Sequence, residues 1–243
     1  EIERFVREDY WQIAAILATP RSQDFEARLT AYEGRKLQKL DIKTSGQASE
    51  IKEMLDGAAF KAMSVEAKPT KRNPGPPFTT STLQQAASSR LGFSANRTMQ
   101  IAQRLYEGVD LGGETAGLIT YMRTDGVQMA PEAISAARAA IAREFGEKYL
   151  PEKPRYYSAK AKNAQEAHEA IRPTDFSRTP ASVKKYLDAD QARLYDIVWK
   201  RAIASQMQPA DIERTTVEIE ARNGARVAGL RAVGSVTRFD GFL

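Results

Sequence analysis

The hydrophobic periodicity of the chain changes twice, and this change limits the folds open to it. Near the start, the runs 11–19 and 25–31 show partial alternation, as strands do. A helical spacing of apolar residues governs the middle of the chain, and alternation returns from Thr215 onward. The simplest arrangement is one β domain interrupted by an inserted helical domain, which predicts an α+β fold.

A Pro-rich segment at 68–77 marks the first boundary between these parts. Pro74, Pro76 and Pro77 place three prolines within four residues, which neither a helix nor a central strand tolerates. We therefore expect residues 1–78 to form the first part of the β domain and residues 79–208 to form the helical domain. Residues 209–243 are then the return strands.

Local signals predict the elements within each part. In the β domain they are a helix over 51–58, a strand over 60–68, and strands 216–221 and 226–232 joined by a type I′ turn at Asn223-Gly224. In the helical domain the signals predict five helices. The first begins at a capping box of Ser81 and Gln84 and ends at Gly92, and the second is capped by Ser94. The third carries the apolar stripe Ile134, Ala137, Ile141 and Phe145, a short fourth runs from Asn163 to Pro173, and the last is capped by Asp188.

Composition narrows the class of protein without fixing it. The 36 Lys and Arg exceed the 31 Asp and Glu by five, which suits a polyanionic partner but does not require one. The chain has no cysteine, so disulfides and thiolate zinc sites are excluded. No apolar run is long enough to span a membrane, the start does not resemble a signal peptide, and no Gly-rich nucleotide loop is present. We expect a cytoplasmic protein with no membrane partner and no ATP-driven activity.

The leading candidate for chemistry is the segment 117–125, in which Tyr121 precedes Arg123 by two residues and Asp125 by four. A tyrosine hydroxyl can attack a phosphodiester if a fixed cation stabilises the charge that builds on phosphorus. Residues i and i+2 share a face only in an extended segment, where Tyr121 and Arg123 could both face one phosphate. The alternative is a surface tyrosine beside an ion pair between Arg123 and Asp125.

Three further groups are weaker candidates. His168, the single histidine of the chain, and Arg172 are spaced i and i+4, so on a helix they would share a face that fits a phosphate or a base edge. Arg90, Arg97 and Arg104 recur every seven residues and could line a groove, or form a solvated helix face. Asp188-Ala189-Asp190 has metal-binding spacing, but Asp188 lies where a helix begins and is better explained as its cap.

Three longer motifs carry a family resemblance. The segments 76–87, 118–125 and 165–173 resemble, in order and spacing, the start of the helical domain, the active-site motif and the histidine segment of bacterial type IA topoisomerases. The resemblance covers most of residues 75–210, and the flanks fit less specifically, ending in a similar Arg238-Phe239-Asp240-Gly241. Met122 after the tyrosine resembles the topoisomerase I branch of this family.

The resemblance implies a function. Such enzymes cut one DNA strand, hold its 5′ phosphate on tyrosine, pass another strand and reseal the break, relaxing negative supercoils without ATP. On this basis Tyr121 is the nucleophile, Arg123 stabilises the scissile phosphate, and His168 and Arg172 hold the DNA, with a less defined role for Asp125. Arg90 and Arg97 are expected DNA contacts.

The resemblance also implies parts that we do not find here. A Toprim domain would supply an acidic residue and bind Mg²⁺, and C-terminal modules would bind DNA; no metal ligands or other cofactors are expected within this chain. Gly126 replaces the serine often found after Thr-Asp in the family. We expect a monomer whose partners are a single-stranded segment of supercoiled DNA and the remaining domains of the same polypeptide, and we expect the chain alone to be inactive.

Three other functions stay open. The chain could be a single-stranded DNA-binding module without catalysis, and trapping DNA on Tyr121 would separate the two. It could be a purely structural gate domain, with affinity for DNA that is negligible. A tyrosine recombinase or type IB enzyme would need an Arg-His-Arg constellation that is placed differently.

Overall fold

The computed structural model describes residues 6–158 and 169–243, and these divide into two compact units. The β unit contains the chain up to Thr70 together with Asp211–Arg238, and the helical unit contains Lys71–Ala210 together with Phe239–Leu243. The α+β class, with a helical body inserted into a β-rich one, is confirmed. The first boundary falls after Thr70 rather than after residue 78, and the last five residues belong to the helical unit rather than to the return strands.

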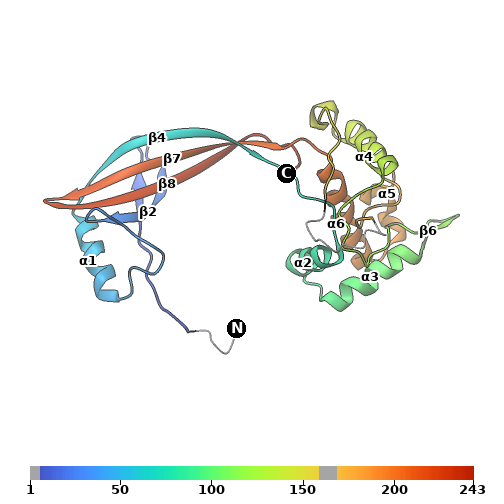
Figure 1. Ribbon diagram of the computed structural model, residues 1–243, viewed down its shortest axis with the longest axis horizontal. Coiled ribbons are helices and arrows are strands. Elements are labelled where there is room, and N and C mark those ends of the chain that lie inside the picture. Colours follow the sequence, from blue (N-terminus) through green and yellow to red (C-terminus); the bar gives the residue numbers. More distant parts are fainter. Residues whose placement is uncertain (1–5, 159–168) are drawn as a thin grey trace. The chain divides into compact units, whose positions relative to one another are not determined.

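The β unit is built on one sheet with the strand order β1-β2-β8-β7-β4, in which β3 also pairs with β2. Figure 1 shows the long strands β4, β7 and β8 running side by side. The strands are β1 (Ala14–Ala18), β2 (Asp24–Tyr32), β3 (Arg35–Lys36), β4 (Ala59–Arg72), β7 (Ala210–Asn223) and β8 (Arg226–Phe239). β4 lies at the edge of the sheet, where a proline such as Pro69 is tolerated because an edge strand forms ladder bonds on one side only.

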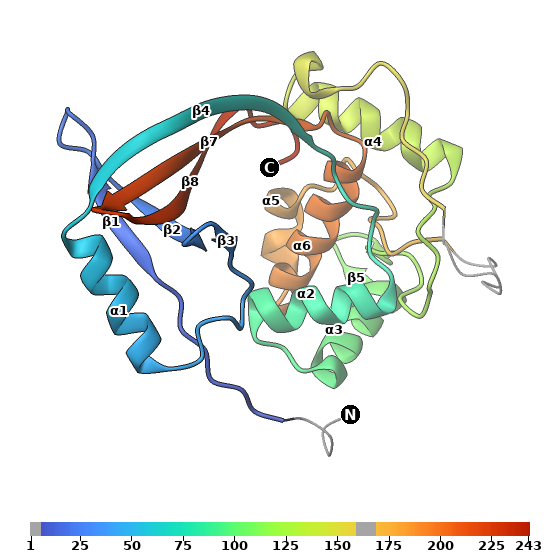
Figure 2. The same cartoon turned by 60° about the vertical axis from the view of Figure 1, so that its left-hand side comes forward.

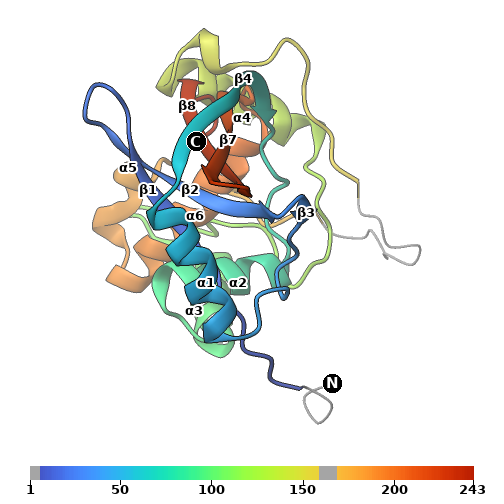
Figure 3. The ribbon, with the colours of Figure 1, turned by 90° about the vertical axis from the view of Figure 1, so that its left-hand side faces the viewer.

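The core of the β unit lies between this sheet and the helix α1 (Ser45–Asp56). α1 begins at a capping box between Thr44 and Gln47 and ends at Gly57, and its buried residues Ile51, Met54 and Leu55 pack with sheet residues such as Leu230. Figure 3 shows α1 beside β1 and β2. The helix predicted over 51–58 is therefore present, although it starts six residues earlier, at Ser45, and ends at Asp56.

The hairpin between β7 and β8 is also confirmed, but its turn type is not. The two loop residues are Gly224 and Ala225, and of these only Gly224 has a positive φ, at 60°. A type I′ turn needs a positive φ at both central positions, whereas a type II′ turn needs it at the first alone. Asn223 is the last strand residue, and its side-chain amide donates to the carbonyl of Met54 at 3.1 Å.

The helical unit packs its longer helices around one apolar core. Figure 2 shows α2, α3 and α6 gathered together, and the buried residues of all three belong to this core. The elements are α2 (Thr80–Leu91), α3 (Ala95–Glu107), β5 (Val109–Asp110), β6 (Thr115–Ala116), α4 (Pro131–Glu144), η2 (Glu147–Tyr149), α5 (Pro180–Val183), η3 (Lys184–Tyr186) and α6 (Ala189–Ser205).

Most of the predicted caps of these helices are correct. Ser94 caps α3, Asp188 caps α6 with Gln191 in a capping box, and Gly92 ends α2 with a φ of 73°. The predicted start of α2 is wrong, because Thr79 and Thr82 form the capping box there, rather than Ser81 and Gln84. The assignment of Asp188 to a structural role is thus supported by its contact with the Gln191 amide.

The last turn of the chain is anchored in the helical unit. The ring of Phe239 stacks on that of Tyr149 at 5.3 Å, and the Tyr149 hydroxyl donates to Asp240 at 3.3 Å. Gly241 has a φ of 54°, and a Cβ there would lie 2.5 Å from the carbonyl oxygen of Pro209. Only glycine fits this close approach, which explains why Phe239–Leu243 belongs to this unit.

No helix in the described part of the chain is both long and apolar enough to cross a membrane.

Candidate active site

Tyr121 follows a short extended segment that is fixed on both sides. Ile119 forms an antiparallel bridge with Pro173, and the Thr120 amide donates to the Arg172 carbonyl at 2.9 Å. The Leu118 amide donates to the Leu105 carbonyl at the end of α3 at 2.7 Å. These bonds connect the segment before the tyrosine to two distant stretches of the chain.

Close packing against α3 continues at the neighbouring residues. A Cβ on Gly117 would lie 2.5 Å from the Tyr106 carbonyl oxygen, so no larger residue fits without a shift of the backbone. The Tyr106 ring meets the half-buried Tyr121 ring edge-on, with centroids 5.4 Å apart. An edge-to-face contact of this kind favours one orientation of the tyrosine ring.

Exposure alternates along the residues that follow. Met122 is fully buried and Thr124 is 8% exposed, whereas Arg123 and Asp125 are exposed. The alternation is that of an extended segment with one face inward, although the chain bends at Met122 and Arg123. That Tyr121 and Arg123 face one phosphate stays a prediction.

The ion pair proposed as the alternative is absent. Among the described residues, Arg123 and Asp125 make no salt bridge with each other or with any other group. The guanidinium of Arg123 is thus accessible to an anionic ligand.

A threonine from α2 bonds to the backbone of this segment. The Thr80 hydroxyl donates to the Met122 carbonyl at 2.7 Å and accepts from the Thr124 amide at 2.8 Å. The Thr80 amide in turn donates to the Thr124 carbonyl at 2.8 Å. The Thr124 hydroxyl accepts from the Gly126 amide at 2.9 Å, which tightens the turn that follows.

No residue of the stretch 169–174 is helical, so the helix predicted to reach Pro173 is wrong over its described residues. Ile171 bridges Phe78, and Ile119 bridges Pro173, so the segment pairs with two others instead of coiling on itself. Asn163, Glu166 and His168 lie outside the described residues. Arg172 is not in a helix, so the helical face that it was expected to share with His168 is not seen at Arg172.

Arg172 is engaged by its neighbours. Its Nε and Nη2 donate to the two carboxylate oxygens of Glu169 at 2.8 and 3.1 Å, and its Nη1 donates to the Pro173 carbonyl at 2.9 Å. Only 13% of its side chain is exposed. The same carboxylate accepts from the Ala130 amide at the start of α4 at 2.9 Å. In this arrangement Arg172 links segments of the protein, and its role as a DNA contact stays a prediction.

Burial alone would raise the pKa of Glu169, but the hydrogen bonds from Arg172 and from the Ala130 amide outweigh it and hold that pKa below its ordinary value. The carboxylate is therefore charged at neutral pH, as the bidentate contact requires.

The three arginines spaced seven apart have different surroundings. Arg97 is bound to Asp190, with Nη2 at 2.7 Å, and Arg104 lies 3.9 Å from Asp188. Arg90 is exposed and has no acidic partner among the described residues. Burial, and then the charge of Arg90, hold the pKa of Arg201 below its ordinary value.

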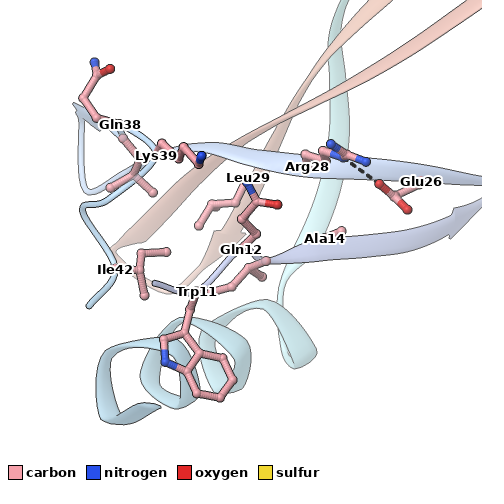
Figure 4. A pocket seen from close by; sticks show the side chains of 11 residues that line it. Trp11, Gln12, Ala14, Glu26, Arg28, Leu29, Gln38, Lys39 and Ile42 are labelled. Carbon is pink, nitrogen blue, oxygen red and sulfur yellow. Dashed lines mark hydrogen bonds and ion pairs between the residues drawn. The ribbon is translucent and has the colours of Figure 1, made fainter. Parts of the chain in front are cut away.

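The described residues contain no group of three or more His, Cys, Asp or Glu that could hold a metal ion. The β unit contains a pocket of about 330 Å³ beside Trp11, in which Arg28 is paired with Glu26 at 2.7 Å (Figure 4). None of the candidate site residues lines this pocket.

Comparison with known proteins decides the family. A family model described as DNA topoisomerase matches residues 1–243. The chain belongs to the DNA topoisomerase family. The resemblance to bacterial type IA topoisomerases is confirmed.

Curated relatives in this topoisomerase family match the chain from end to end. It is 48% identical to DNA topoisomerase 1 of Rickettsia felis over 242 residues, covering 100% of this chain and 31% of that protein. It is 51% identical to DNA topoisomerase 1 of Zymomonas mobilis over 243 residues, covering 100% of this chain and 19% of that protein. The chain thus spans less than a third of the length of these relatives.

A solved structure is similar throughout the chain. Full-length topoisomerase I from Thermotoga maritima superposes with a TM-score of 0.77 at 34% sequence identity, covering 99% of this chain and 36% of that one. The fold of this chain is therefore similar to that of the matching part of a topoisomerase I.

Sequence reasoning missed Thr80, Glu169 and Tyr106. Thr80 and Glu169 lie inside motifs that the sequence singled out, but the backbone groups they bond, those of Met122 and Thr124 for Thr80 and the Ala130 amide for Glu169, are 39 to 44 residues away in the chain. Spacing within a motif cannot show such contacts. The Tyr106 contact also depends on packing between α3 and the tyrosine segment.

Proposed function

We propose that this chain supplies the nucleophile and the strand gate of a type IA topoisomerase. Tyr121 attacks a phosphodiester of one DNA strand, and the 5′ phosphate becomes bonded to its oxygen. The opening then lets another strand pass, and reversal of the reaction reseals the break. Because the phosphotyrosine bond conserves the bond energy, relaxation of negative supercoils needs no ATP.

The observation that carries the proposal is the backbone geometry around Tyr121. Its segment is fixed by the Arg172 carbonyl before it and by Thr80 after it, and the exposed Arg123 lies two residues after the tyrosine. A nucleophile and a cation held on rigid backbone provide the preorganisation that phosphoryl transfer requires.

In the cleavage step the Tyr121 oxygen bonds to phosphorus as the bond to the 3′ oxygen breaks. The phenolic proton is lost to solvent or a base, and the 3′ oxygen gains a proton from an acid that we place in the remainder of the whole protein. Arg123 stabilises the charge that develops on the phosphate oxygens. The described residues contain no cluster that suits a metal ion, so the Mg²⁺ of the whole protein would be held by its remaining part.

The distribution of charge supports DNA as the partner. The helical unit holds 20 Lys and Arg against 15 Asp and Glu, whereas the β unit holds 16 of each. The whole excess of five positive charges therefore belongs to the unit that contains Tyr121. The same excess favours the second candidate function, a single-stranded DNA-binding module that performs no chemistry.

One experiment separates the two functions. The chain is mixed with a separately produced N-terminal piece that carries a Toprim domain, with labelled single-stranded DNA and Mg²⁺, and then denatured. We expect labelled DNA to stay attached to this chain through a 5′ phosphate, and Tyr121→Phe to abolish the attachment. DNA binding without any adduct would favour the binding module.

The chain by itself is expected not to relax a negatively supercoiled plasmid in Mg²⁺, since it supplies the nucleophile but not the acid. Gel electrophoresis of the plasmid after incubation measures this directly. Relaxation by the purified chain, lost in Tyr121→Phe, would show that this division of roles is wrong.

A further inference from the structure

We propose that Thr80 is a positioning residue that fixes the backbone on both sides of Arg123; the inference rests on the function proposed above. Thr80 is the first residue of α2, and the atoms it bonds belong to residues 42 and 44 positions later in the chain. Its hydroxyl donates a hydrogen bond to the Met122 carbonyl at 2.7 Å and accepts one from the Thr124 amide at 2.8 Å.

These two partners lie on either side of Arg123. The Met122 carbonyl belongs to the peptide group before the arginine, and the Thr124 amide belongs to the peptide group after it. Holding both peptide groups fixes the backbone of Arg123, while its side chain stays exposed. The Thr124 carbonyl, 3.0 Å from the same hydroxyl, is bonded to the Thr80 amide at 2.8 Å, which adds a second connection to α2.

Starting the helix does not require this hydroxyl. Thr79 is the N-cap of α2, and it exchanges bonds with Thr82 in the capping box. The Thr80 side chain therefore contributes to the tyrosine segment rather than to its own helix. Thr82, also a threonine in the first turn but without a bond to that segment among the described residues, is a matched control.

The segment that Thr80 bonds is otherwise deeply packed. The Met122 side chain is fully buried and Thr124 is 8% exposed, so water cannot readily replace a lost hydroxyl. In Thr80→Val the shape is retained, but the Met122 carbonyl and the Thr124 amide lose a partner. The segment must then shift or loosen, and Arg123 shifts with it.

The first test uses the 243-residue chain itself. Hydrogen exchange at the Thr124 amide is expected to be faster in Thr80→Val than in the wild type, and close to wild type in Thr80→Ser and Thr82→Val. Unchanged exchange in Thr80→Val would overturn the proposal, whatever the protein's activity is.

The second test uses a full-length polypeptide that contains this chain. In a single-turnover assay with single-stranded DNA and Mg²⁺, Thr80→Val is expected to form the covalent adduct about tenfold to a hundredfold more slowly, the scale of loss from a small misplacement of catalytic groups. Its Kd for DNA is expected to be unchanged, and Thr80→Ser is expected to restore the rate. If Thr80→Val does not fold, Thr80→Ala replaces it.

A merely structural role would give another pattern. In that case the rate of adduct formation would fall in both Thr80→Val and Thr82→Val, in each by an amount that follows its loss of Tm. This result would overturn the proposal. Failure of the proposed function is recognised separately, because an adduct that survives Tyr121→Phe refutes the nucleophile while leaving the exchange result at Thr124 intact.

Discussion

At the scale of single residues, the site separates arginines that are committed within the protein from those that are available to a ligand. Arg172 and Arg97 are held by Glu169 and Asp190, whereas Arg90 and Arg123 are exposed without an acidic partner in the described residues. A guanidinium that already has a carboxylate partner must exchange it for a phosphate, so it gains less from DNA. Arginines that are equally spaced in the sequence are therefore expected to differ in how strongly they bind DNA.

Arg90 and Arg97 provide a direct test of this difference. We expect Arg90→Ala to weaken single-stranded DNA binding and to reduce the slope of log K against log salt by about 0.7, the value for one lost phosphate contact. Arg97→Ala is expected to leave the slope nearly unchanged, because Asp190 neutralises Arg97 in the free protein. Fluorescence anisotropy over a series of salt concentrations measures both slopes, and equal reductions would contradict the assignment.

At the scale of elements, the sequence predicted what depends on neighbours in the chain. The caps at Ser94 and Asp188, the stop at Gly92 and the β7–β8 hairpin all follow from side chains within a few residues. The predicted helix through Arg172 failed because Ile171 pairs with Phe78, which lies far away in the sequence. Tertiary pairing overrides local spacing there.

Glu169 connects these extended elements to α4, and its contribution is expected to depend on pH. Its folded pKa is depressed, so the stability it contributes is present above the unfolded value of about 4.3 and is lost as pH falls through the folded pKa. At pH 7 we expect Glu169→Gln to reduce the free energy of unfolding by roughly 1 kcal/mol, a value that allows for solvent screening at this partly exposed group. Urea unfolding followed by circular dichroism measures it.

The matched control for this prediction is Glu114→Gln. Glu114 also pairs with an arginine, Arg178, at 2.7 Å, but 63% of its side chain is exposed, so we expect a much smaller effect. The difference between wild type and Glu169→Gln should shrink as the pH is lowered below 4. A difference that stays constant down to pH 3 would mean that the charge of Glu169 does not contribute.

At the scale of the whole molecule, sequence periodicity was sufficient to predict a helical body inserted between strands, since that pattern is spread over many residues. The ends of the bodies were less well predicted. Phe239–Leu243 continues the strand pattern, yet the stacking of Phe239 on Tyr149 and the close approach at Gly241 place it with the helical unit. Such contacts between distant residues leave no periodic signal.

The two units also differ in charge, and this difference predicts where DNA binds. Because the helical unit carries the whole positive excess, single-stranded DNA is expected to slow hydrogen exchange in its peptides, especially near Arg90 and Arg123. In the β unit Arg231 and Arg238 are paired with Glu218 and Glu213, so their peptides should exchange at the same rate with and without DNA. Mass spectrometry of the full chain, at low and at high salt, measures the two sets of peptides in one experiment.

The protection of the helical unit by DNA should disappear at high salt, since it depends on phosphate contacts. Protection centred on β8 instead would show that net charge does not locate the binding surface, and that paired arginines exchange their carboxylates for phosphates readily.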